Sequence, residues 1–229
     1  MTRPRQSAAI NRSGDHDLPA ALLVVVAAWF LTALAGGAYG VFEAPPSRPP
    51  LALLAAVAGP LLVFAAAYRA SPFFRDFALG LDLRLLTAFQ AWRVLGGIFL
   101  ALYAVGALSG FFAWPAGAGD MAVGLAAPFV LRAMIRGAPT WRRQVAWLNV
   151  AGLIDFAGAV ATGVLTSNSS LGVLADGATR ASLGLLPLSL IPTFAVPLTL
   201  TLHAISLAVV LQGDQFAEGR GRRLMERTG

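Results

Sequence analysis

Three ionisable side chains lie inside long apolar segments of the sequence: Arg93, Asp155 and His203. Hydrocarbon penalises ionisable groups, so a residue of this kind within a membrane segment is a candidate for function. A carboxylate can bind a proton or a cation, and an imidazole can relay or sense protons. We therefore expect a proton or ligand site in which Asp155 is the binding group. Arg93 would tune its proton affinity, and His203 would relay or sense protons.

Polar and small residues recur near these three side chains at spacings of three and four, which places them on one face of each helix. Gln90 and Asn149 are the polar neighbours, and we expect them nearer the cytoplasmic exit of the site. The other members of these faces are Gly97, Ala101, Ala104, Gly152, Gly158, Thr162, Thr199 and Ser206. Small residues let helices approach closely, and polar ones bond across the interface. The alternative is structural: a neutral Arg93–Asp155 pair that locks the bundle, with His203 bonded to a carbonyl.

Asp120 is a weaker site candidate. It ends the string Gly117–Asp120, which resembles the GxGD motif of intramembrane aspartyl proteases. Such enzymes need a second aspartate, and Asp155 is the other intramembrane candidate. Asp155 follows the motif, which is the reverse of the order in that family. We expect Asp120 near the outer boundary, as the N-cap of a helix after a glycine turn.

Other chemistries lack the residues they need. There is no Cys, which excludes disulfides and thiolate sites. Haem ligation by two histidines is not expected, because His16 lies in a polar tail; a quinone site at His203 stays open. No sequence motif indicates a cofactor, a metal or nucleic acid, and the catalytic residues of any enzyme remain unknown. We expect no cofactor.

The elements that must hold these side chains are membrane helices. Hydrophobic residues make up 57% of the 229 residues, charged residues 12%, and mean hydropathy is +0.71. Soluble domains carry about 25% charged residues. We predict an all-α, polytopic membrane bundle of about six transmembrane helices plus a short interfacial helix, since each span needs roughly 20 residues.

Apolar runs place the spans at about 20–40, 51–68, 86–111, 120–134, 145–165 and 185–211. Ser71 and Pro72 begin the interfacial helix, and residues 112–119 form a tight turn. Prolines 187, 192 and 197 either kink the last span or break it around a site. Residues 19–212 form one transmembrane domain between cytoplasmic tails at 1–18, which is flexible, and at 213–229. Residues 33–35 could also be a signal-peptide cleavage site.

The arginines predict the orientation. All seventeen basic residues are Arg, and with these spans all but Arg48 and Arg180 fall on one side. Positive residues accumulate on the cytoplasmic side of a membrane. We therefore predict a multi-pass protein of a bacterial inner membrane with both termini in the cytoplasm.

Three functions remain open. The first is binding or transport of a small solute, ion or proton through the seam of the third to sixth spans. The second is a non-transporting subunit or sensor that associates with other membrane subunits. The third is a membrane enzyme acting on a lipid, quinone or peptide, which would need a second catalytic group beside Asp155 or Asp120. In each case the lipid bilayer is the surrounding partner.

Overall fold

The computed structural model describes the backbone of residues 17–175 and 183–228 and the side chains of residues 21–175 and 183–212. This part of the chain is helical without strands, and six of its helical segments are long and apolar enough to cross a membrane. The predicted polytopic helical bundle is therefore confirmed. The first two spans are α1 (Asp17–Ala38) and α2 (Leu51–Ala70). The others are α4 (Leu83–Phe89), η2 (Gln90–Gly97) and α5 (Ile98–Ala104) together, then α6 (Gly110–Ile135), α7 (Trp141–Leu165), and η3 (Ile191–Ala195) with α8 (Val196–Thr228).

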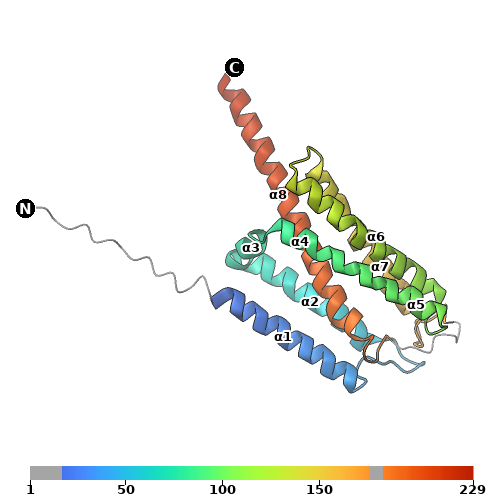
Figure 1. Ribbon diagram of the computed structural model, residues 1–229. Helices are drawn as coiled ribbons and strands as arrows, with labels where there is room; N and C mark the ends of the chain where they lie inside the picture. The colour runs from blue at the N-terminus through green and yellow to red at the C-terminus, as the bar shows by residue number, and fades with distance from the viewer. Residues whose placement is uncertain (1–16, 176–182, 229) are drawn as a thin grey trace, which may run out of the picture.

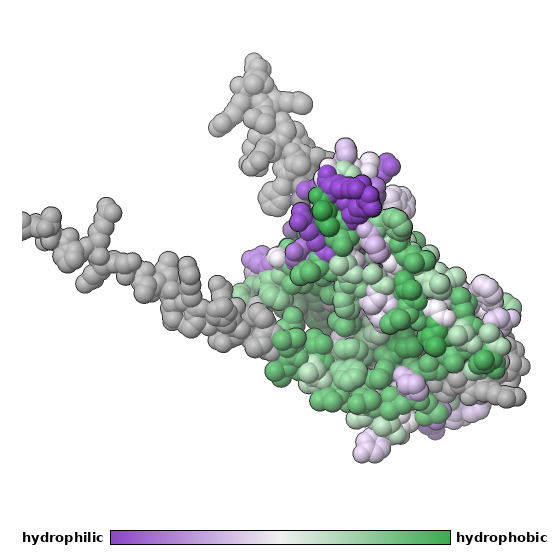
Figure 2. Space-filling model, viewed as in Figure 1, coloured by the Kyte–Doolittle hydropathy of each residue, from purple (hydrophilic) through white to green (hydrophobic). Residues whose placement is uncertain are grey.

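Large apolar side chains cover the outside of this bundle. Leu23 is 70% exposed, Leu62 69% and Phe129 74%. Figure 2 shows a largely apolar flank, with hydrophilic side chains gathered toward one end of the molecule. A soluble monomer rarely exposes so much contiguous apolar surface, whereas lipid tails solvate such a surface. The surface therefore fits a multi-pass membrane protein.

The short helix α3 (Pro72–Leu79) joins the second span to the third and begins where the sequence predicts. Ser71 Oγ accepts a hydrogen bond from the Phe74 backbone N–H at 3.2 Å, and Pro72 occupies the first helical position. Asp82 caps α4 in the same way, accepting from Arg84 N–H at 2.8 Å. These side-chain caps satisfy backbone donors that a helix start otherwise leaves unpaired.

The fourth span corrects the predicted boundaries. α6 begins at Gly110, so residues 112–119 are helical and do not form a turn. Pro115 lies inside this helix. A proline frees a backbone carbonyl, and membrane helices tolerate it because neighbouring helices, side chains or local adjustments of the helix satisfy that carbonyl. Gly117 allows close packing, because a Cβ there would lie 2.9 Å from Leu100 Cγ and 3.3 Å from the Gly96 carbonyl oxygen.

Two spans contain an irregular helical segment. The third span runs from residue 83 to 104, earlier than predicted, and its centre is the 3₁₀ helix η2. The last span starts at Ile191 with the π-helical turn η3, which contains Pro192. A 3₁₀ segment is narrower than an α-helix and a π turn is wider, so each re-aims the side chains beside it. Both irregular segments belong to spans that carry a buried polar residue.

The spans with polar faces form one packed body. α6 lies along η2 and α7, and α7 lies along α8 (Figure 1). α1 runs along the edge of this body and meets it at η3, where Trp29 Nε1 donates a hydrogen bond to the Thr193 carbonyl oxygen at 3.1 Å. The core that positions the polar residues is therefore built by the third to sixth spans.

Six crossings bring the start of α1 and the far end of α8 to the same end of the bundle (Figure 1). This arginine end, as we call it, also holds the ends of helices at Arg69, Arg84, Arg136 and Arg143. The opposite, distal end holds the connections at residues 39–50, 105–109 and 166–175. The assignment of the arginine end to the cytoplasm stays a prediction.

Candidate functional site

Arg93 lies at the centre of the polar site. It projects from η2, and its side chain is only 1% exposed. Its Nε donates to Asp120 Oδ1 at 2.7 Å, its Nη1 contacts His203 Nε2 at 2.9 Å, and its Nη2 donates to Asp155 Oδ2. One guanidinium thus joins α6, α7 and α8 to η2. Each of its three nitrogen atoms has a partner on a different helix.

An aromatic ring completes the surroundings of the guanidinium. The Phe156 ring centroid lies 4.0 Å from Arg93 Cζ, a cation–π geometry, and the ring also meets His203 edge-on at 6.1 Å. An arginine over an aromatic face is attracted by the ring quadrupole, most strongly where water is excluded. Phe156 follows Asp155 directly in the sequence, so one turn of α7 supplies both a charged and an aromatic contact.

The hydrogen-bond partners determine the tautomer of His203. Arginine has only donors, so His203 Nε2 must be the acceptor at this contact. The proton then sits on Nδ1, which donates to Asn149 Oδ1 at 2.8 Å. Asn149 Nδ2 in turn donates to Ser206 Oγ at 3.1 Å and to the Val145 carbonyl oxygen at 2.8 Å. A buried chain therefore runs from the two carboxylates through Arg93 to the α7–α8 interface.

Glycines make room for this cluster. A Cβ at Gly152 would overlap His203 Nε2 and would lie 2.7 Å from Arg93 Nη1. A Cβ at Gly119 would overlap the Asp155 carboxylate, and one at Gly96 would overlap Asp120. A glycine in a helix interior costs about 0.5–1 kcal/mol relative to alanine. These glycines therefore have a packing reason, which is to admit polar side chains between closely spaced helices.

The structure brings some of the sequence candidates together and leaves others apart. Arg93, Asp155, His203 and Asn149 form one hydrogen-bonded set. Gln90 is buried but bonds to its own helix, through Nε2 to the Leu86 carbonyl oxygen at 3.5 Å, and its Oε1 has no partner among the described residues. The two threonines of the predicted faces, Thr162 and Thr199, also bond within their own helices.

The predicted position of Asp120 was wrong. It was expected at the outer boundary as a helix N-cap, yet it lies in the middle of α6 and binds Arg93. The error came from starting the fourth span at residue 120 instead of Gly110. Phe156 was missed altogether, because neither the spacing nor the type of a phenylalanine in an apolar helix distinguishes it from lipid-facing neighbours.

The same geometry weighs against an aspartyl protease. Asp120 and Asp155 both contact Arg93, so the two carboxylates lie close together. Each, however, accepts a hydrogen bond from the same guanidinium. A catalytic dyad needs two carboxylates that share one proton and activate water between them. Here each carboxylate is paired with Arg93 instead. In addition, Asp155 follows the GxGD string, which is the reverse of the order in the protease family.

No group of three or more His, Cys, Asp or Glu side chains suited to a metal ion occurs in the described part of the chain. The two aspartates and His203 each contact the Arg93 guanidinium. The site is thus organised around an internal organic cation.

Comparisons with known proteins identify the family. Residues 50–211 match the family described as a domain of unknown function (DUF8737), which covers more than half of the chain. The chain therefore belongs to this family. The matched region runs from the start of α2 through the membrane part of α8 and includes every residue of the cluster. No curated protein and no solved structure matches the chain.

Proposed function

We propose that this protein binds and moves a proton or a small cation through the seam formed by its third to sixth spans. It would do so as a multi-pass protein of a bacterial inner membrane, with both chain ends in the cytoplasm. The observation that carries the proposal is the charge of the cluster. One guanidinium is paired with two carboxylates, Asp120 and Asp155, which leaves one formal negative charge without a counter-charge.

Such an excess is costly inside a bilayer, so a proton or a small cation is needed to neutralise it. His203 does not supply the missing positive charge, because its acceptor contact with Arg93 requires the neutral ring. The carboxylates are also more accessible than the arginine: the side chains of Asp120 and Asp155 are 14% and 10% exposed, against 1% for Arg93. An exchangeable charge would therefore be taken up at an aspartate, with Arg93 as the fixed counter-charge.

The test is a flux measurement on purified protein in liposomes. A pH-sensitive dye inside the vesicles reports proton entry after a potassium diffusion potential is imposed, and Na⁺ or K⁺ gradients test cations. We expect Asp120→Asn and Asp155→Asn each to abolish the flux. Asp76→Asn, an acidic residue on the exposed face of α3, is the control and should leave it unchanged.

A second function is favoured by the completeness of the network. All three guanidinium nitrogens, both His203 nitrogens and the Asn149 amide have partners. A satisfied polar network of this kind can simply fix the arrangement of the helices in a non-transporting subunit. Absence of proton and cation flux in folded wild-type protein would overturn the transport proposal and leave this structural role.

A further inference from the structure

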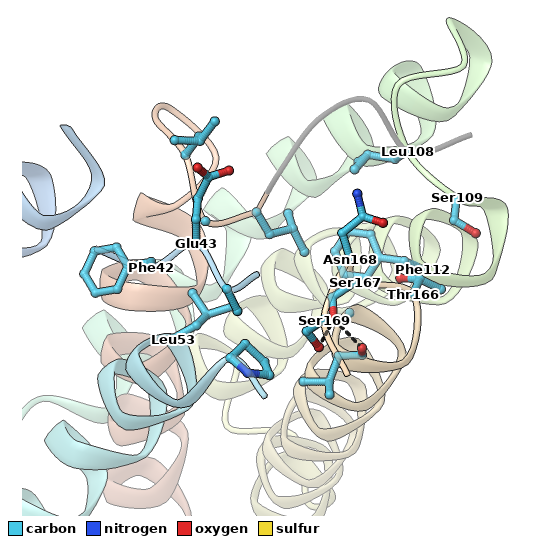
Figure 3. Close-up of a pocket in the computed structure, with 17 residues that line it drawn as sticks. Phe42, Glu43, Leu53, Leu108, Ser109, Phe112, Thr166, Ser167, Asn168 and Ser169 are labelled. Carbon is cyan, nitrogen blue, oxygen red and sulfur yellow. Dashed lines mark hydrogen bonds between the residues drawn. The ribbon is translucent and has the colours of Figure 1, made fainter. Parts of the chain in front are cut away.

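A pocket of about 280 Å³ opens at the distal end of the bundle. Its walls come from the connection after α1, from the start of α6 and from the end of α7 with the residues that follow. In Figure 3, Glu43 and Phe42 lie on one side of the pocket and Ser109 and Phe112 on the other, with Asn168 between them. Ser109 is 2% exposed, and its Oγ has no hydrogen-bond partner among the described residues. We call this space the vestibule.

A second, smaller cavity of about 60 Å³ lies next to the vestibule and leads toward the polar cluster. The two share the lining residues Leu53, Phe112, Gly163, Val164 and Leu183. The rest of the smaller cavity's lining is apolar side chains of α2, α5, α7, η3 and α8, together with Asp120 and Phe156 of the polar cluster. We call it the neck. The two spaces are therefore adjacent, and together they extend from the distal end to a carboxylate that binds Arg93.

The lining has one sign of charge. Glu43 is the ionisable side chain of the vestibule and Asp120 that of the neck, and both are acidic. Clefts lined by one sign of charge raise the local concentration of the opposite ion, particularly between walls of low dielectric constant. No arginine lines either space in the part of the chain that the structure describes. The lining thus favours cations and disfavours anions.

The dimensions limit what can travel. A water molecule occupies about 30 Å³ of liquid, so the neck holds one or two water molecules, whereas organic ligands need pockets of roughly 300 Å³ or more. The apolar walls of the neck offer few hydrogen bonds to a hydrated ion. Only a proton carried on water, or a small monovalent cation that sheds most of its water, fits this passage.

We infer that the vestibule and the neck are the entry route from the distal end to Asp120, and that the route is selective for protons or small monovalent cations. This inference rests on the proposed function, whose charged centre it connects to one face of the membrane. It also gives the two aspartates different roles. Asp120 lines the neck and faces the incoming ion, while Asp155 lines neither cavity and lies against Gly119.

The sequence contains no cysteine, so a single introduced thiol reports on its own position alone. Val160 lines the neck, and Ile154 on the same helix is 67% exposed on the outside of the bundle. Val160→Cys and Ile154→Cys are placed in lipid nanodiscs and treated with Ag⁺, a small monovalent cation. Thiols left unreacted are then counted by maleimide labelling after denaturation and mass spectrometry. Thiols react as thiolates, which form in water and not in lipid.

We expect Ag⁺ to protect Val160→Cys at least tenfold faster than Ile154→Cys. A bulky trimethylammonium thiosulfonate should leave Val160→Cys unmodified but should react with Asn168→Cys in the vestibule. Adding Glu43→Gln should slow the Ag⁺ reaction of Val160→Cys about threefold at low salt, the effect of about one kT of local potential. Asp76→Asn, at the arginine end, is the control and should not slow it. Should Val160→Cys disturb folding, Ala159→Cys in the same lining replaces it.

Equal protection of Val160→Cys and Ile154→Cys would overturn the route. If Val160→Cys is protected quickly and Glu43→Gln does not change that rate, the route is also overturned, because the ion would then reach Val160→Cys without passing Glu43. The labelling needs no flux, so it separates the two proposals. A reactive neck in a protein without flux contradicts the proposed function alone. A closed neck in a protein whose flux requires Asp120 contradicts the route alone.

Discussion

At the scale of single residues, the cluster owes its character to the geometry of one guanidinium. Its fork presents donors in three directions, and an aspartate, a histidine and a second aspartate each take one. Lysine could not replace it, because an ammonium group is a point charge without this planar fork. The two aspartates are therefore alternative counter-ions to the same cation, and this makes a prediction about their removal.

We expect Asp120→Asn and Asp155→Asn to be tolerated singly and not together. Each single variant keeps one carboxylate against Arg93, so the pair is neutral and the melting temperature in detergent should fall by a few degrees at most. The double variant strands a buried guanidinium without a counter-charge, which costs about 3–5 kcal/mol. Thermal unfolding and size-exclusion profiles of the four proteins measure the effect.

The control for this experiment is Asp76→Asn combined with either single variant, which should behave as the single variant does. If the double variant loses no more stability than the sum of the two singles, the aspartates do not share the charge of Arg93. A large loss from Asp155→Asn alone would instead indicate that the Arg93–Asp155 pair has a structural role.

At the scale of elements, the cluster depends on how closely α6, α7 and η2 approach one another. Gly124 of α6 faces η2 so tightly that a Cβ there would lie 2.5 Å from the Val94 backbone nitrogen. Gly152 of α7 performs the same function on the other side of Arg93. Small residues at such interfaces replace the hydrophobic effect, which does not operate between helices in lipid, with close packing.

Gly152→Ala is predicted to destabilise the protein by about 1–3 kcal/mol, because the added methyl group overlaps His203 and crowds Arg93. The matched control is Gly158→Ala on the same helix, where a Cβ meets nothing within 4 Å. Alanine favours helices over glycine by about 1 kcal/mol, so this variant should be as stable as the wild type or slightly more so. Chemical denaturation of both variants in the same detergent compares them. Equal stability of the two would show that α7 shifts to accept the methyl group.

At the scale of the whole molecule, six crossings give the bundle an arginine end and a distal end. The rule that positive residues remain in the cytoplasm then predicts which end faces outward. The vestibule lies at the distal end, so on this orientation it would open away from the cytoplasm. Protons or cations entering by the neck would come from outside the cell.

Impermeant maleimide labelling of intact spheroplasts tests this orientation in the cysteine-free background. Ser47→Cys, at the distal end, should be labelled in intact spheroplasts. Thr140→Cys, in the connection between α6 and α7, should be labelled only after the membrane is permeabilised. Both positions are exposed, so burial does not explain a difference. The reverse labelling pattern would show that the protein has the opposite orientation in the membrane, and the proposed entry would then face the cytoplasm.

The class of the fold could be predicted from the amino-acid sequence alone. Hydropathy is a local property, since each run of about 20 apolar residues meets the bilayer without reference to other runs. The number of spans, the limits of α2 and the start of α3 at Ser71 and Pro72 could therefore be predicted. Helical spacing likewise placed Arg93, Asp155 and His203 on faces shared with small and polar residues, and the expectation of one site followed from those faces.

The partner of Asp120 was decided by the tertiary structure. Pro115, Gly117 and Gly119 have the composition of a turn, and only the packing of α6 against η2 explains why a helix continues through them. The 3₁₀ form of η2, the ring of Phe156 against the guanidinium and the adjacent positions of vestibule and neck follow from the same close contacts. Such features depend on which side chains from distant segments fill the space between helices, and no local pattern in the chain records that.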